Sequence, residues 1–359
     1  MRDGEFHIEK KGEERQMIQT WKGFQHGVNL GGWLSQCNHT QERYDHFIRE
    51  EDIDVLASWG LDHIRVPVDY NLVEDEKGQY REEGFARLAR TIEWCRKRGL
   101  NMVLDLHKTY GFSFDDGEEE TGFFENEAHQ ERFYRLWEQF ARRFGNSADM
   151  LAFELLNEVT DQAYSDRWNR IADTCVRRIR AIAPDICILI GGYWNNSIDA
   201  LPDLAMPQDE HIIYNFHCYD PVVFTHQGAP WVRGMDTAFR FDLARPTGEL
   251  IAHTIRMMGQ KDLDFEGMEA EKPLSAEYFI HRFTKAVQVA EKRGVRLYCG
   301  EYGVIDRASP EDTVKWYEMI HEAFERFGIG RAAWSYREMD FGLSDARLKA
   351  VLPKLIPLL

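Results

Sequence analysis

The sequence is poor in the features that mark several large classes of protein. Its six cysteines are scattered, without a CxxC pair or a zinc-type spacing, so we expect free thiols and no metal site of that kind. Acidic residues outnumber basic ones by 61 to 44, and the net charge of −17 argues against nucleic acid or an anionic membrane as a partner. No run of about 18 apolar residues occurs, so we expect no membrane-spanning helix.

Short motifs for other kinds of chemistry are also missing. The sequence contains no GxGxxG, GxxxxGK[ST], HExxH or GxSxG pattern, and Asp115-Asp-Gly-Glu does not reproduce an EF-hand loop. We therefore expect no cofactor and no metal. The first residues, Met1 to His7, carry no apolar segment, which predicts no signal peptide and a cytoplasmic protein unless a leader has been removed. We expect a monomer.

What the sequence does contain is a regular alternation of strands and helices. Hydrophobic residues make up 43% of its 359 residues, enough for a large core, and ten tryptophans raise the aromatic share to 13%. Helical patterns near 50–59, 82–98, 129–144, 165–183, 275–293, 310–327 and 345–357 separate or follow short apolar runs. Those runs predict eight strands, at 24–33, 63–68, 101–107, 151–158, 187–192, 211–219, 297–303 and 331–336. Eight such units predict a (β/α)8 TIM barrel, an α/β fold in which residues 1–359 form a single catalytic domain.

Three segments fall outside this alternation. Residues 5–23 alternate apolar and polar side chains and predict a small hairpin at the bottom of the barrel. Residues 108–128 and 220–274 are too long for simple connections, and both follow strands, which places them on the face where barrel active sites are built. We expect residues 220–274 to form a subdomain inserted after strand six, with short helices of its own, as one wall of a cleft.

Two of the predicted strands end on carboxylates. The run Leu151 to Glu158 is mostly apolar and predicts a strand covered on both faces, yet it ends on Asn157 and Glu158. The run from Leu297 to Gly303 similarly presents Glu301. A pair of carboxylates held at the ends of neighbouring strands is what the cleavage of a glycosidic bond requires.

Polar and aromatic residues also mark the carboxyl ends of the other strands. Taken singly, each has a structural explanation, such as an ion pair, a buried histidine, ordinary packing or a helix cap. Together, at one end of every strand, they are not what core packing would produce. These residues are Asn29, Trp33, Arg65, His107, Trp194, His217, Tyr219 and Trp334.

These residues resemble the motifs of clan A glycoside hydrolases, and specifically of family five, the cellulase family. The resemblance rests on Arg65, His107, Asn157-Glu158, His217-Cys-Tyr219, Glu301 within Gly-Glu-Tyr-Gly, and Trp334, and it runs over nearly the whole chain. The opening Gly-Val-Asn-Leu-Gly-Gly-Trp ending at Trp33 fits it as well. Phe-Glu-Leu-Leu-Asn-Glu, Tyr-Asn-Phe-His-Cys-Tyr-Asp-Pro and the insertion after strand six resemble compact bacterial β-1,4-endoglucanases.

The resemblance implies a role for each of the two carboxylates. Glu158 would be the acid/base, with a pKa raised by a negatively charged neighbour, and Glu301 would be the nucleophile that forms a covalent glycosyl-enzyme. Arg65 would hold Glu301 ionised and aimed, with a hydrogen bond from Tyr219. His217 would lie near Glu158 and tune it.

The other matching residues would bind the sugar. Asn157 would contact the 2-hydroxyl, His107 other hydroxyls of the same ring, and Trp334 would lie beneath that ring. We also expect substrate contacts from Asn29, Trp33, Trp194 and from Trp231 in the insertion.

Strand parity makes a separate prediction about two cysteines. Cys299 and Glu301 are two residues apart, so both should point into the barrel, with Cys299 one layer deeper. Cys218 should point outward, towards the helices.

The leading interpretation is therefore a retaining endo-β-glucanase acting on β-1,4 or mixed β-1,3/1,4-glucan. A β-mannanase or an exo-β-glucosidase would use the same machinery, and the loops 108–128 and 220–274 would decide between them. A carbohydrate-binding barrel without catalysis would be expected to lack one of the two carboxylates, and both Glu158 and Glu301 are present.

Overall fold

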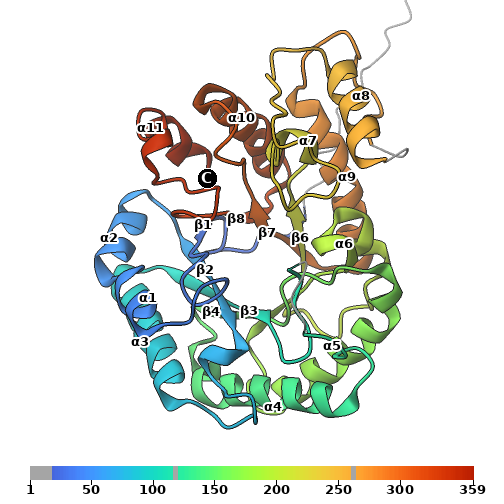
Figure 1. The fold of residues 1–359 in the computed structure, drawn as a ribbon. Coiled ribbons are helices and arrows are strands. Elements are labelled where there is room, and N and C mark those ends of the chain that lie inside the picture. The colour runs from blue at the N-terminus through green and yellow to red at the C-terminus, as the bar shows by residue number, and fades with distance from the viewer. Residues whose placement is uncertain (1–17, 116–119, 260–263) are drawn as a thin grey trace, which may run out of the picture.

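The computed structural model describes residues 18–115, 120–259 and 264–359, and their strands form a closed parallel barrel (Figure 1). Strands β1 to β8 follow one another around the barrel in chain order. The predicted (β/α)8 fold is confirmed. The strands are β1 His26–Asn29, β2 His63–Asp69, β3 Asn101–Lys108, β4 Leu151–Glu154, β5 Cys187–Ile190, β6 Ile212–Cys218, β7 Arg296–Tyr302 and β8 Gly330–Ala333.

Helices surround the barrel and cover the outer side of its strands (Figure 1). The α-helices are α1 Gln41–His46, α2 Glu50–Ser58, α3 Glu82–Arg98, α4 Glu127–Phe144, α5 Ser165–Arg180, α6 Tyr193–Asn196, α7 Val222–Thr225, α8 Thr247–Met258, α9 Ala276–Arg293, α10 Pro310–Phe327 and α11 Leu352–Leu355. Short 3-10 helices occupy Tyr70–Leu72, Gly145–Ser147, Gln162–Tyr164, Ile198–Asp203, Ala346–Leu348 and Ile356–Leu358.

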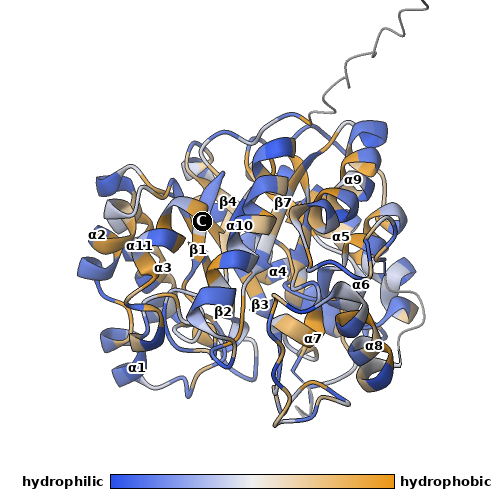
Figure 2. Ribbon diagram, turned by 90° about the horizontal axis from the view of Figure 1, so that it is seen from above, coloured by the Kyte–Doolittle hydropathy of each residue, from blue (hydrophilic) through white to orange (hydrophobic). Residues whose placement is uncertain are grey.

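Local sequence accounts for the helix boundaries, and α10 is a clear case. The Ser309 hydroxyl accepts the backbone N–H of Asp312 and caps the helix, and Pro310 fills the first turn, where no N–H partner is needed. The helix ends at Gly328, whose φ of 67° suits a residue without a side chain. Hydrophilic residues face outward along such helices, and hydrophobic residues face the barrel (Figure 2).

The hydrophobic core has two layers. A large cluster lies between the strands and the helices, and a smaller one fills the inside of the barrel around Val103, Ile213 and Tyr298. Trp21 and Phe24, which precede β1, stack at 3.9 Å and belong to the inner cluster. They fill the barrel at the amino-terminal ends of the strands, so any site must lie at the opposite end.

Two expected elements differ from the structure. Most of the hairpin expected at 5–23 lies outside the described residues, and residues 18–23 form a turn and no strand. The helix expected at 345–357 is instead two 3-10 helices flanking the four-residue α11. Pro353 and Pro357 explain this, because a proline inside a helix removes a hydrogen bond and clashes with the preceding turn.

The segment between β6 and α9 contains α7 and α8, which lie side by side (Figures 1 and 2). Phe241 and Leu250 from this segment are buried in the same cluster that packs the helices onto the barrel. Among the described residues, no helix has the length and apolar character needed to cross a membrane.

Strand β7 contains a bulge that changes which way its side chains point. Phe216 pairs with Cys299 and His217 with Glu301, so Gly300 has no partner in the ladder. Tyr298 packs inside the barrel, whereas Cys299 packs among the helices, as Cys218 does. The parity prediction was therefore wrong for Cys299 and is confirmed for Cys218.

Candidate active site

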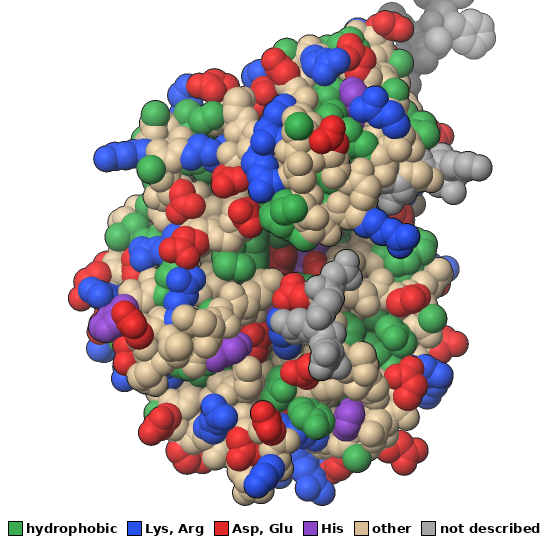
Figure 3. All heavy atoms as spheres, in the orientation of Figure 1, with side chains coloured by type: hydrophobic (Ala, Val, Ile, Leu, Met, Phe, Trp, Pro, Cys, Tyr) green, Lys and Arg blue, Asp and Glu red, His purple; other side chains and the backbone are tan. Residues whose placement is uncertain are grey.

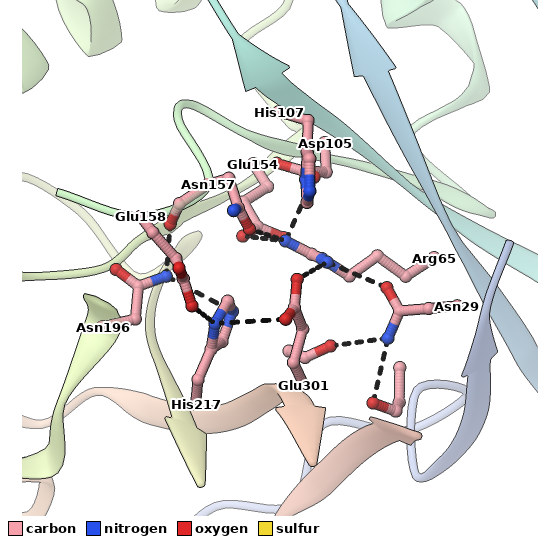
Figure 4. Close-up of polar contacts among 12 residues, drawn as sticks. Asn29, Arg65, Asp105, His107, Glu154, Asn157, Glu158, Asn196, His217 and Glu301 are labelled. Atoms are coloured by element: carbon pink, nitrogen blue, oxygen red, sulfur yellow. Dashed lines mark hydrogen bonds and ion pairs between the residues drawn. The ribbon is translucent and has the colours of Figure 1, made fainter. Parts of the chain in front are cut away.

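Arg65 on β2 lies at the centre of the polar groups at the carboxyl ends of the strands (Figure 4). Its Nε and Nη2 donate to the two oxygens of Glu154 at 2.7 and 2.8 Å, and its Nη1 donates to Glu301 Oε1 at 2.8 Å. Nη1 and Nη2 also donate to Asn29 Oδ1 and Asn157 Oδ1, at 2.8 and 2.7 Å. All five guanidinium N–H groups therefore have acceptors, and the side chain is completely buried.

Two buried carboxyl groups lie against this arginine. Glu154 on β4 and Asp105 on β3 are both fully buried, and Asp105 Oδ2 is 3.1 Å from Arg65 Nη2. Burial raises the pKa of Asp105 to about 7, against the opposing effect of Arg65, and burial also raises the pKa of Glu154. One guanidinium faces three carboxyl groups when Glu301 is included, so a single positive charge serves three acidic side chains.

Glu301 on β7 is held from two sides. Arg65 binds one of its oxygens, and the Tyr219 hydroxyl donates to the other at 2.9 Å. Asn215 on β6 fixes the bulge below it, because Asn215 Oδ1 accepts the Gly300 N–H at 2.9 Å. Two donors of this kind stabilise a negative charge and fix its direction, as a nucleophile requires.

Glu158 follows β4 and has different surroundings. His217 Nδ1 lies 2.7 Å from its Oε1, and Asn195 Nδ2 donates to its Oε2 at 2.7 Å. Burial raises the pKa of Glu158, and burial also lowers the pKa of His217 to about 4, so this imidazole is neutral at neutral pH. From the sequence we expected a negatively charged neighbour to be what raises the pKa of Glu158. The structure gives desolvation as the larger cause, with Asp115 as a lesser one.

The space between the two glutamates is narrow. One oxygen of each carboxylate and a nitrogen of His217 all lie within 4.8 Å of one another. In the space-filling view this face is hollowed near its centre, and acidic and histidine side chains lie at the bottom of the hollow (Figure 3).

Groups suited to binding a sugar surround this pair. Asn157 Nδ2 is buried and has no hydrogen-bond partner within the described part of the chain, so it is a donor left for a ligand. The indole of Trp334 lies parallel to the His107 ring, with 5.6 Å between centroids, and His107 Nδ1 lies 2.6 Å from Asp105 Oδ2. Gly31 leaves room for this indole, because a Cβ there would lie 2.8 Å from it.

The structure brings together most of the residues singled out from the sequence, and two are corrected. Trp33 is completely buried, and its indole N–H donates to the Tyr44 carbonyl at 2.9 Å, so it cannot contact a substrate. Asn29 is also completely buried. Its amide nitrogen donates to the carbonyls of Gly300 and Ala332 and its oxygen binds Arg65, so it positions Arg65.

The two remaining tryptophans lie at the surface. Trp194 is 52% exposed and directly precedes Asn195, which binds Glu158. Trp231 is 46% exposed and precedes Val232, which packs against the cluster that contains Trp334.

Sequence reasoning did not single out five residues that shape the site. Asp105 and Glu154 could have been found from the sequence, because each is a carboxylate inside an apolar strand, in Leu-Asp-Leu and Phe-Glu-Leu. The three asparagines had no such signal, because asparagine is common in loops and its partners come from other strands. The five are Asp105, Glu154, Asn195, Asn196 and Asn215.

Among the described residues, two groups of side chains have the composition and spacing of cation ligands. The first is Glu158, His217 and Glu301, whose hydrogen bonds are described above. The second is Asp264, Glu266 and His281, where Asp264 already pairs with His281 at 2.8 Å and with the cations of neighbouring residues on α9. In the first group all three residues have hydrogen-bond partners, and in the second Asp264 and His281 do.

Comparison with known proteins identifies what the chain is similar to. The family model described as Cellulase (glycosyl hydrolase family 5) matches residues 20–340. Cellodextrinase A of Ruminococcus flavefaciens is 48% identical over 310 residues, covering 86% of this chain and 84% of that protein. Endoglucanase C of Acetivibrio thermocellus is 37% identical over 354 residues, covering 94% and 98%. Among solved structures, endoglucanase Cel5A from Thermotoga maritima superposes with a TM-score of 0.75 at 25% identity, covering 94% and 97%. Structures of that enzyme include complexes with mannotriose and cellobiose.

Proposed function

The chain belongs to glycosyl hydrolase family 5, the cellulase family, and we propose that it is a retaining β-glucanase that cleaves β-1,4-linked glucan. The observation that carries this proposal is the short separation of Glu158 and Glu301, which have carboxylate oxygens within 4.8 Å of each other. A retaining mechanism needs carboxyl groups about 5–5.5 Å apart, whereas an inverting one needs about 6.5–9.5 Å to admit a water.

In the first step Glu301 attacks the anomeric carbon and Glu158 protonates the departing glycosidic oxygen. Arg65 and Tyr219 hold the attacking carboxylate ionised and in position. The buried environment raises the pKa of Glu158, which favours the protonated form that a general acid needs. The product is a covalent glycosyl-enzyme and a released leaving group.

In the second step Glu158, now ionised, takes a proton from water, which displaces Glu301. The free donor on Asn157 is suited to the 2-hydroxyl of the sugar in both steps, where the bond strengthens as positive charge develops on the ring. His107 would bind other hydroxyls of that sugar, and Trp334 would lie beneath it.

We further propose β-1,4-glucan and its soluble oligosaccharides as the substrate class. Two relatives that align over most of their length are named for action on such glucans, one an endoglucanase and one a cellodextrinase. The inserted subdomain, residues 220–274, would form one wall of the cleft, with Trp194 and Trp231 as aromatic contacts at its rim. Mixed-linkage glucan is a second candidate. Mannan is a third, because Cel5A of Thermotoga maritima has been solved with mannotriose.

The test is a product profile on soluble β-1,4-glucan, mixed-linkage β-glucan, β-mannan and cello-oligosaccharides, with proton NMR of the first product. We expect cleavage of β-1,4-glucan and its oligosaccharides, with the β-anomer formed first. Glu301→Gln should lower kcat by at least about 1,000-fold, since the nucleophile is lost while binding remains.

Other outcomes would revise specific parts of the proposal. An α-anomer as first product would contradict retention. Cleavage of mannan alone would contradict the substrate class and leave the mechanism in place. Slow loss of viscosity with monomer or dimer released from the start would favour an exo-acting enzyme.

A further inference from the structure

The loop that follows β5 has an unusual backbone and lies against the segment that carries Glu158. Trp194, Asn195 and Asn196 have φ values of 50°, 57° and 56°, a left-handed conformation that asparagine tolerates better than most residues. The Asn195 N–H donates to the carbonyl of Val159, the residue after Glu158, at 3.0 Å. The backbone therefore fixes the Asn195 side chain relative to Glu158.

Both oxygens of Glu158 face nitrogen atoms. Asn195 Nδ2 lies 2.7 Å from Oε2, and His217 Nδ1 lies 2.7 Å from Oε1. The amide nitrogen of Asn195 can act only as a donor in this contact, because it carries N–H groups and accepts no hydrogen bond. Asn195 therefore favours a negative charge on Glu158.

Asn196 favours the tautomer of His217 that carries its proton on Nδ1. The Asn196 amide nitrogen donates to the Asn157 carbonyl and lies 3.4 Å from His217 Nε2. A neutral imidazole has one donor and one acceptor, so Nε2 accepts and Nδ1 donates to Glu158. Gly191 makes this possible, since a Cβ there would lie 2.0 Å from Asn196 Oδ1.

We propose that Asn195 is a positioning residue that tunes Glu158, by a hydrogen bond that strengthens as Glu158 gives its proton to the leaving group. The inference rests on the proposed function, in which Glu158 is the acid/base. A bond from an amide to a carboxylate is about twice as strong as one to a neutral carboxylic acid, so the Asn195 bond contributes more after proton transfer than before it. The proton itself moves from a Glu158 oxygen to the glycosidic oxygen as the bond to the anomeric carbon breaks.

The proposal predicts the direction of a change in pH dependence. Asn195 opposes the effect of burial on the pKa of Glu158, so its removal raises that pKa further. The other ionisable groups that face Glu158 stay in place in such a variant. They are Arg65 on β2, Asp105 and His107 on β3, Asp115 after β3, His217 and Tyr219 at the end of β6, and Glu301 on β7.

The experiment compares two substrates in Asn195→Gly and Asn195→Asp, replacements that both tolerate a left-handed backbone and both lack the donor. Cellotetraose has a leaving group that needs a proton, whereas 2,4-dinitrophenyl β-cellobioside has one that does not. For Asn195→Gly we expect kcat/KM on cellotetraose to fall about tenfold, as for loss of a bond to a charged group. On the dinitrophenyl substrate it should change less than about twofold. The alkaline limb of kcat/KM on cellotetraose should move up by roughly half to one pH unit. In Asn195→Asp it should move further, because a second carboxylate is added.

Glu338→Gly is the matched control, since Glu338 is an exposed residue with a φ of 53° and no contact with Glu158 among the hydrogen bonds of the described chain. It should leave the pH profile and the ratio of the two substrates unchanged. Equal losses on both substrates with an unmoved alkaline limb, in Asn195 variants that melt within a few degrees of wild type, would overturn the inference and leave the proposed function intact. A wild-type chain that cleaves neither substrate would contradict the proposed function, and the inference with it.

Discussion

At the scale of single residues, one cationic side chain serves several buried carboxyl groups in the site. Arg65 is the one cation in direct contact with Asp105, Glu154 and Glu301 among the described side chains. The neutral amides of Asn29 and Asn157 accept the remaining N–H groups of Arg65, and the amide of Asn215 donates to Glu154. Neutral partners complete the network without adding charge, which a buried site tolerates better than further ions.

Asn157 offers a prediction at this scale. Its Oδ1 is bound by Arg65 and its Nδ2 is a buried donor without a partner in the described residues. Asn157→Ala should lower kcat/KM on cellotetraose by about 100-fold (about 2.7 kcal/mol), with most of the loss in kcat, because the proposed bond to the 2-hydroxyl would strengthen in the transition state.

Asn157→Asp is the companion variant, because it keeps an acceptor for Arg65 and replaces the donor by a carboxylate oxygen, which also adds a charge near Glu158. A comparable loss in both variants would assign the effect to the donor. A loss in Asn157→Ala that Asn157→Asp restores would show that the Arg65 contact is what matters. Steady-state kinetics on purified proteins with matched melting temperatures measure both.

At the scale of elements, small departures from regular geometry decide which side chains reach the site. The bulge at Gly300 turns Glu301 inward, although Cys299 two residues before it points outward. Asn157 and Glu158 lie beyond the end of β4, which stops at Glu154, so their positions come from the turn that follows the strand. The left-handed loop after β5 supplies Asn195 in the same way.

Gly300→Ala tests the importance of the bulge. A Cβ at this position would lie 2.8 Å from Asn215 Oδ1 and 3.0 Å from His217 Nε2, so the strand or those side chains must shift. We expect kcat/KM to fall at least about tenfold, because a displacement of Glu301, the proposed nucleophile, by a few tenths of an ångström would disturb its line of attack.

Gly294→Ala provides the contrasting control. Gly294 caps α9 with a φ of 65°, and a Cβ there would meet nothing within 4 Å. This variant should lose about 1 kcal/mol of stability from the left-handed backbone while keeping full activity. Thermal melts and steady-state kinetics of both variants provide the measurement. A Gly300→Ala enzyme as active as the Gly294→Ala enzyme would contradict the prediction.

At the scale of the whole molecule, the barrel separates stability from chemistry. Trp21, Phe24 and the inner cluster fill the amino-terminal end of the strands, and the helices cover their outer side. The carboxyl ends are left to polar groups, which is the arrangement that (β/α)8 enzymes share. The net charge of −17 is carried by the chain as a whole and has no counterpart in an uncharged glucan.

Ionic strength should therefore have little effect on substrate capture. Raising NaCl from 20 to 500 mM should change kcat/KM on cellotetraose by less than about twofold, since no long-range attraction or repulsion acts on a neutral ligand. A charged substrate would behave differently, and a change of tenfold or more would contradict the proposal of a neutral glucan. Initial rates at fixed pH, with melting temperatures recorded at each salt concentration, provide the measurement.

The sequence by itself determined the fold and the location of the site, because strand–helix alternation is a local pattern and parallel strands all end at one face. For that reason Glu158, Glu301, Arg65 and His107 could be found from strand ends alone. The tertiary structure decided what each side chain touches. Trp33 is buried, Asn29 binds Arg65 and two backbone carbonyls, and a bulge between Cys299 and Glu301 places these two side chains on opposite sides of the strand. The partners of Glu158 come from β6 and from the loop after β5, which only closure of the barrel brings together.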